Sequence, residues 1–314
     1  MIEPALPEGE SKRISALERT RLLDSEPEKR FDRYVNLAAK LFDVPIALIS
    51  LVDNHRQWFK SKAGLDAEET SRAVSFCGHA ILDNEIFLVN DARRDNRFDD
   101  NPLVVDAPNV IFYAGQPVRA VGGEPVGTLC LIDHEPREFD AVEADLLRQF
   151  GKLVSAEISR KLSVMHDKET NITNRFGIEL LSRLSFALCD HKGINVVLTL
   201  FELTPGSQAE NNFHIDSETS GRFAEFLDNA VPNGDLIARI GKRLFVGMFV
   251  DAEIDTVKKL GSDVAKQAAS MLPTSVSVRM SFTERKSGSG QEFSVLLDSA
   301  LKGLNESVGI REAS

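Results

Sequence analysis

The sequence contains few of the residues that build covalent or metal-stabilised frameworks. Among its 314 residues are only three cysteines, Cys77, Cys130 and Cys189, and no two of them have the CxxC spacing. An odd number of widely separated cysteines argues against a disulfide framework and against a zinc ribbon. We therefore expect reduced thiols and no bound metal.

Long apolar runs and an excess of positive charge are also missing. No run approaches the roughly 20 apolar residues of a membrane helix, and residues 1–25 lack the apolar core of a signal peptide. The chain carries 37 basic and 48 acidic residues, a net charge of −11, which argues against duplex DNA as a partner. We expect a soluble, cytoplasmic protein that binds neither nucleic acid nor membrane.

The first half of the chain predicts an antiparallel sheet flanked by helices. Apolar residues at three- and four-residue spacing predict a helix over Glu28–Phe42, and a short helix is expected at Ser75–Leu82. Strand-forming runs are separated by turn residues. The expected strands are Pro45–Val52, Gln57–Lys60, Ile86–Val89, Val110–Val118 and Val126–Asp133.

Helical and strand patterns alternate in the second half, which predicts a mixed α/β domain with a central sheet. The expected helices are Arg175–Leu188, Ser220–Ala230, Ile254–Met271 and Glu292–Asn305. The expected strands are Ile194–Leu203, Leu236–Ile240, Leu244–Val250 and Ser275–Phe282. The predicted fold class is therefore α+β or mixed α/β in two domains.

One apolar stripe runs past the end of the first domain. Its members are Leu146, Phe150, Leu153, Val154, Ile158, Leu162 and Met165. The spacing predicts a linker helix of roughly 25 residues. A helix that leaves one domain for another often pairs with its copy, so we expect a homodimer. The alternative is a helix packed on its own sheet.

Several motifs of the first half occur together in one order. They are Ser75–Ile81, Asp91–Phe98, Asn101–Val104, Phe112–Gly115 and Gly127–Asp133. Through them residues 20–162 resemble a GAF sensory domain, preceded by an extension at residues 1–19. The resemblance implies the fold and a sensory role but names no ligand.

Residues 163–314 resemble a GGDEF domain, the diguanylate cyclase fold, in outline. Asp167, Thr170, Asn174 and Arg175 match that family's opening motif, and Ala238–Phe245 aligns with its signature hairpin. The resemblance also places Asp216 near the guanine position, Asp235 at the product-inhibition site and Asn305 where a phosphate-binding lysine would stand.

The same resemblance indicates that the signature is degenerate. In this chain the signature positions are occupied by Gly241, Lys242, Arg243, Leu244 and Phe245. Lys242 replaces the glycine that approaches the phosphates, Arg243 replaces the metal-binding acid, and Leu200 occupies the likely position of the other metal ligand. Magnesium requires hard oxygen ligands, and an arginine puts a positive charge where the dication must sit. We therefore expect no catalytic residue, no metal and no enzymatic activity.

Seven residues of the first domain are candidates for a ligand pocket, and all of them could equally belong to the core. They are Trp58, Phe76, Cys77, His79, Phe98, Tyr113 and Cys130. Cys77, His79 and Cys130 could also form a metal or haem site, and Cys77 could sense oxidants, but buried apolar cysteines are the simpler interpretation.

The predicted function is signal transduction, in which a GAF sensor regulates an inactive GGDEF-like output domain that binds protein or nucleotide. The alternative is a residual diguanylate cyclase that makes cyclic di-GMP from two GTP. Lys242 and Arg243 could hold a phosphate without metal, or could simply be a solvated turn. Expected partners are an unknown small molecule at the GAF domain, GTP or cyclic di-GMP, a partner protein and a second copy; no cofactor is expected.

Overall fold

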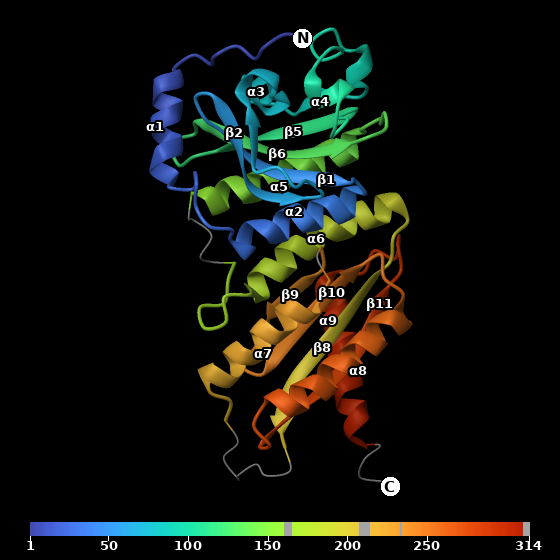
Figure 1. The fold of residues 1–314 in the computed structure, drawn as a ribbon. Helices are drawn as coiled ribbons and strands as arrows, with labels where there is room; N and C mark the ends of the chain where they lie inside the picture. The colour runs from blue at the N-terminus through green and yellow to red at the C-terminus, as the bar shows by residue number, and fades with distance from the viewer. Residues whose placement is uncertain (160–164, 207–213, 233, 310–314) are drawn as a thin grey trace. The chain divides into compact units, whose positions relative to one another are not determined.

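The chain forms two compact units, Met1–Leu162 and Ser163–Ser314, in a computed structural model. The structure describes residues 1–159, 165–206, 214–232 and 234–309. Figure 1 shows that each unit is built around its own β-sheet.

Unit 1 contains a six-stranded sheet in which every pairing is antiparallel. Its strand order is β3-β2-β1-β6-β5-β4. The strands are β1 (Ile46–Val52), β2 (Arg56–Ala63), β3 (Glu69–Ser71), β4 (Phe87–Val89), β5 (Phe112–Arg119) and β6 (Pro125–Asp133). The pairs β1–β2, β2–β3 and β5–β6 follow one another directly in the chain, whereas longer segments with short helices connect β3 to β4 and β4 to β5.

Helices cover both faces of this sheet. The helices α2 (Lys29–Phe42) and α5 (Ala141–Ile158) pack against each other and against β1, β2, β5 and β6. The short α3 (Phe76–Ala80) packs on β1, β5 and β6, and α1 (Glu10–Thr20) packs on β6. Single turns complete the unit: η1 (Arg72–Val74), η2 (Ala92–Arg94) and α4 (Pro102–Val105).

The apolar stripe of α5 is used inside unit 1. Leu146, Phe150, Val154 and Ile158 are all buried, and α5 packs on β5 and β6. The helix ends at Ile158, and Met165 is not helical. The prediction of one helix from Leu146 to Met165 is therefore wrong, because the apolar stripe of α5 covers the sheet of its own domain. Residues 160–164 lie outside the described residues.

Unit 2 contains a five-stranded mixed sheet in the order β11-β8-β10-β9-β7. The strands are β7 (Thr173–Asn174), β8 (Val196–Pro205), β9 (Leu236–Arg239), β10 (Leu244–Val250) and β11 (Val276–Arg285). The pair β7–β9 is parallel and the other pairs are antiparallel. The hairpin β9–β10 carries the signature residues at its turn.

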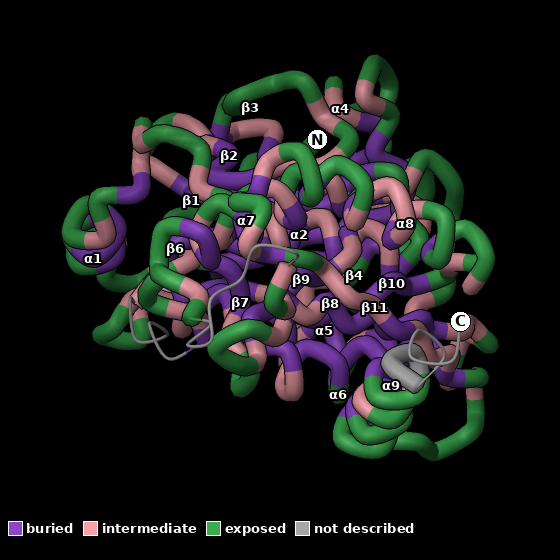
Figure 2. Tube along the Cα trace, turned by 90° about the horizontal axis from the view of Figure 1, so that it is seen from below, coloured by how far each residue is buried: buried purple, intermediate pink, exposed green. Residues whose placement is uncertain are grey.

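Two pairs of helices cover the sheet of unit 2. The helices α7 (Ser217–Ala230) and α8 (Ile254–Met271) contact each other, with α7 on β9 and α8 on β8 and β11. The helices α6 (Arg175–Lys192) and α9 (Phe293–Gly309) also contact each other, with α6 on β9 and β10 and α9 on β8 and β11. Most residues of β8, β9 and β10 are buried, whereas β11 is mostly half-buried; buried segments are purple in Figure 2.

The structure confirms the expected fold class of two mixed α+β domains, and most of the predicted elements lie within a few residues of their expected bounds. The helix α1 and the short strands β3 and β7 were not predicted. No described helix is long and apolar enough to cross a membrane.

Candidate functional site

An aromatic cluster occupies the α3 face of the unit 1 sheet. The rings of Phe76 and Phe98 are stacked with their centroids 4.0 Å apart, and Tyr113 lies 5.2 Å from Phe76. All three side chains are at most 3% exposed, and Cys77 and Cys130 belong to the same buried cluster. Five of the seven candidate pocket residues are thus brought together in one buried cluster.

Trp58 is separated from this cluster. It is half-buried on β2, whereas the adjacent Phe59 is buried in the cluster. Successive side chains of a strand point to opposite faces, so Trp58 shares a face with Lys60. Lys60 lies over the ring of Phe31 in α2, 5.5 Å from its centroid. The sequence predicts the strand but not the face that each residue presents.

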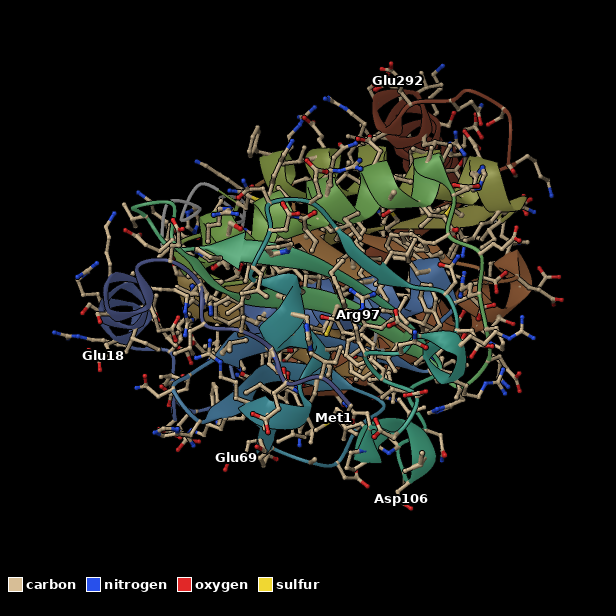
Figure 3. All side chains as sticks on the ribbon, turned by 90° about the horizontal axis from the view of Figure 1, so that it is seen from above. Met1, Glu18, Glu69, Arg97, Asp106 and Glu292 are labelled. Carbon is tan, nitrogen blue, oxygen red and sulfur yellow. The ribbon has the colours of Figure 1, made fainter. Side chains whose placement is uncertain are left out.

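His79 lies at the edge of the cluster, beneath the N-terminal residues. Its Nε2 is 3.0 Å from the carbonyl oxygen of Ile2, and the amide of Ile2 donates to the carbonyl of Arg97 at 3.0 Å. Met1 and Arg97 are both labelled in Figure 3. Burial lowers the pKa of His79 even though the bond to Ile2 raises it. The imidazole is therefore neutral near pH 7 and donates from Nε2.

The proposed metal site is not assembled. His79 stacks on Phe87 with a centroid distance of 6.0 Å, while the sulfurs of Cys77 and Cys130 contact each other at 3.9 Å. Within the described ranges no three His, Cys, Asp or Glu side chains are grouped to hold a metal ion. Cys77 and Cys130 form a pair of buried thiols instead.

In unit 2 some of the signature residues lie at an exposed turn and others lie in the hydrophobic core. Gly241, Lys242 and Arg243 are exposed at the β9–β10 turn, and Leu244 is half-buried. Phe245 is fully buried, and its ring packs edge-on against Phe223 at 5.1 Å. The backbone amide of Leu203 donates to the carbonyl of Arg243 at 2.9 Å, so the end of β8 fixes the position of the turn.

The acidic side chain at this hairpin is Glu202, which sequence reasoning missed. Glu202 is directly opposite Leu244 in the β8–β10 pairing, whereas Leu200 is fully buried opposite Val246. The assignment of Leu200 to the position of a metal ligand stays a prediction. The alternation of β8 was the available signal, because residues two apart share a face.

A cavity of about 360 Å³ adjoins the turn. It is lined by Glu202, Lys242, Arg243, Leu244, Leu301, Leu304 and Asn305. The Glu202 carboxylate accepts from Arg279 at 2.5 Å, and Arg279 also donates to the Leu304 carbonyl at 3.4 Å. The cavity thus combines two cations of the turn, one amide and one ion-paired carboxylate.

Arg239 connects the opening motif to the turn. Its guanidinium, 8% exposed, donates to Asp167 at 3.1 Å and to Glu169 at 2.5 Å. It also donates to the Lys242 carbonyl at 3.1 Å. Burial would raise the pKa of Asp167, but hydrogen bonds from Thr170 and Arg239 lower it. The opening motif therefore positions the turn through one buried cation.

Other residues that match the GGDEF motifs support the fold locally. Asp216 caps α7 by accepting from the Thr219 amide at 2.7 Å. Asp235 accepts from the Val250 amide at 2.9 Å, and Asn174 caps α6 by accepting from the Gly177 amide at 2.9 Å. Such caps satisfy backbone groups that a helix end leaves unpaired.

The antiparallel sheet of unit 1, with α3 over one face and α2 and α5 over the other, coincides with a known family. The family model described as GAF domain matches residues 26–158. Residues 26–158 are a GAF domain. The resemblance drawn from the motifs around Cys77 and Cys130 is confirmed.

A cyclic di-GMP phosphodiesterase from Pseudomonas aeruginosa is 40% identical to this chain over 182 residues. The match covers 57% of this chain and 31% of that protein, so the chain spans about a third of the length of this relative.

Solved structures resemble each unit separately. The GGDEF domain of DgcB from Caulobacter crescentus, in complex with c-di-GMP, is 16% identical and covers 46% of this chain and 87% of that chain, with a TM-score of 0.42. The GAF domain of a phosphoenolpyruvate-protein phosphotransferase from Acinetobacter is 20% identical and covers 49% and 96%, with a TM-score of 0.36.

The relative corrects one expectation. We expected no enzymatic activity, and this is wrong, since the relative at 40% identity is named as an enzyme. The physical reason is that the argument from Lys242, Arg243 and Leu200 addressed one reaction only, the magnesium-dependent joining of two GTP. It carries no information about hydrolysis of cyclic di-GMP.

Proposed function

We propose that this chain works in cyclic di-GMP signalling, with the GAF domain as a sensor and unit 2 as a GGDEF-like domain. In this proposal unit 2 binds a guanine nucleotide, cyclic di-GMP or GTP, at the cavity beside the β9–β10 turn and thereby controls hydrolysis of cyclic di-GMP. The name of the Pseudomonas relative supports the pathway.

The residues that line the cavity are the main support for a nucleotide-binding site there. Lys242 and Arg243 are adjacent cations at its rim, and an arginine can hold a phosphate through two parallel hydrogen bonds. Two cations offset the charge of a phosphodiester without a metal ion. Asn305 adds an amide, and Glu202 adds acceptor oxygens of the kind that a guanine edge can bond.

Arg239 offers a route from the start of unit 2 to this cavity. Its bonds to Asp167 and Glu169 lie at the beginning of the unit, and its bond to the Lys242 carbonyl lies at the turn. A displacement of the opening motif would therefore be transmitted to the turn backbone. In this proposal the GAF domain acts on unit 2 by shifting the population of two such arrangements.

Isothermal titration of the chain with cyclic di-GMP, and separately with GTP and magnesium, tests the proposal. We expect binding of at least one nucleotide, and binding weaker by at least about tenfold in the variant Lys242→Ala/Arg243→Ala, because loss of one charge-assisted contact costs about 1.5–3 kcal/mol.

Lys266→Ala is the matched control, since Lys266 is an exposed cation of α8 away from the turn. The affinity of this variant for each nucleotide should equal that of the unchanged chain. Absence of binding, or equal binding by both variants, contradicts the nucleotide site. Assays of cyclic di-GMP hydrolysis and of its formation from GTP then identify the reaction, and formation would favour the cyclase alternative.

The GAF ligand, a partner protein and the homodimer stay predictions. Four residues of the stripe that suggested the dimer, Leu146, Phe150, Val154 and Ile158, are buried in unit 1, so these four would not form the contact between two copies. Analytical ultracentrifugation across a range of concentrations tests the homodimer.

A further inference from the structure

The core of the GAF domain contains two thiols in contact. Cys77 lies on α3 and Cys130 on β6, and their sulfurs are 3.9 Å apart. Cys77 is 2% exposed and Cys130 is fully buried. The third cysteine, Cys189, is equally buried but belongs to α6 of unit 2. The chain therefore holds one thiol pair and one single buried thiol for comparison.

Hydroxyl groups surround the sulfur of Cys77. The Tyr113 hydroxyl donates to it at 3.3 Å. Ser50 and Thr128 are opposite each other in the β1–β6 pairing, and Thr128 shares a face of β6 with Cys130. Their hydroxyls are buried and, in the part of the chain that the structure describes, have no partner of standard hydrogen-bond geometry. An apolar core has no need of such donors, whereas a sulfur anion does.

The protonation of the pair follows from these donors. Burial would raise the pKa of Cys77, but interactions with Cys130, Thr128, Tyr113 and Ser50 outweigh burial and lower it. The pKa of Cys130 is raised, chiefly by its bond to Cys77. Cys77 is therefore the thiol of the pair that loses its proton more readily.

We propose that Cys77 and Cys130 are a peroxide-oxidised dithiol site in the core of the GAF domain. The Cys77 thiolate attacks one oxygen of a hydroperoxide, so that an S–O bond forms, the O–O bond breaks and the leaving oxygen takes a proton. Cys130 then attacks the sulfenic sulfur, the S–O bond breaks, and water leaves with the Cys130 proton. Two thiols and one hydroperoxide give one disulfide, one alcohol or water, and one water.

Oxidation would move α3. A disulfide has sulfurs about 2.05 Å apart, so the pair must approach by about 1.9 Å from 3.9 Å. The five-residue α3 also carries Phe76 and His79 of the aromatic cluster. The disulfide would therefore reposition the aromatic cluster. This site is independent of the nucleotide proposed for unit 2.

Treatment of the folded chain with hydrogen peroxide tests the proposal. After timed quenching, unfolding and alkylation, mass spectrometry measures each cysteine. We expect a disulfide between Cys77 and Cys130 within one chain, formed at least about tenfold faster than Cys189 is oxidised, since the thiolate is the reactive form. In Cys130→Ser, Cys77 should accumulate as a sulfenic acid that dimedone traps.

Thr128→Val is a milder variant that keeps both cysteines and the shape of the side chain. Loss of one donor to the anion should slow oxidation of Cys77 about tenfold. Thr199→Val is the matched control, because Thr199 has a buried hydroxyl in unit 2 without a partner of standard geometry among the described residues. It should leave the rate unchanged. Oxidation of Cys77 at the rate of Cys189, or equal slowing by both variants, overturns the proposal.

Discussion

At the scale of single residues, the structure shows which charged side chains pair with each other, and the sequence did not reveal these partners. Arg239 could be aligned with a motif, but its contacts with Asp167 and Glu169 join segments about 70 positions apart. The same holds for Glu202 and Arg279, which pair across β8 and β11. Motif spacing identified the turn, whereas the identity of the carboxylate beside it depended on strand register.

Arg239→Ala should lower the free energy of unfolding of unit 2 by about 2–3 kcal/mol, because it removes a buried guanidinium that donates to the half-buried Asp167 and to the Lys242 carbonyl. Urea denaturation followed by circular dichroism measures the change. Arg243→Ala, at the exposed turn, should change stability by no more than about 0.5 kcal/mol. Equal effects of the two substitutions would contradict the role of Arg239.

Glu10 predicts a pH dependence of stability in unit 1. Burial alone would raise its pKa, but Arg13 and Arg72 lower it from 4.5 to about 2. A lowered carboxyl pKa stabilises the fold above pH 4.5, and this stabilisation is lost as the pH falls toward 2. The full shift is worth about 3 kcal/mol, and solvent screening reduces this to about 1–2 kcal/mol. Glu10→Gln should flatten the acid limb of the unfolding curve; an unchanged limb would count against the assignment.

At the scale of elements, periodicity predicted the long helices and strands because each presents one apolar face to its own sheet. It could not tell what the stripe of α5 would cover, since packing on β5 and packing on a second chain require the same spacing. Periodicity also missed α1, which is held partly by polar contacts. Arg13 and Arg72 both donate to the Glu10 carboxylate, and Arg13 also donates to the Val52 carbonyl at 2.7 Å.

Leu17→Ala should show that α1 is part of the folded core of unit 1. Leu17 is fully buried, and removal of such a side chain costs about 2–4 kcal/mol. Leu6→Ala serves as the control, because Leu6 is 67% exposed and its loss should have little effect. If thermal melting shifts equally for both variants, α1 does not contribute to the core.

At the scale of the whole molecule, each compact unit has a hydrophobic cluster of its own among the described residues. The cluster around Phe76 and Tyr113 belongs to unit 1, and the cluster around Phe223 and Phe245 belongs to unit 2. Length and the change of pattern near residue 160 already indicated two domains. The sequence could not indicate which activity the protein serves, because substitutions at one reaction centre do not report on a different reaction.

Scanning calorimetry should resolve two unfolding transitions, since each unit has its own core and a two-state description fits single domains. Leu17→Ala should lower the midpoint of one transition and Arg239→Ala that of the other. A single transition that both substitutions shift together would show that the units unfold cooperatively.

The position of Trp58 has a practical consequence for such experiments. It is the single tryptophan of the chain, half-buried on β2 of the GAF domain, and unit 2 contains none. Fluorescence excited at the red edge of protein absorption therefore reports on unit 1 alone, while far-ultraviolet dichroism reports on both units. Comparing the two signals assigns each ligand, oxidant or substitution to the unit on which it acts, without an added label.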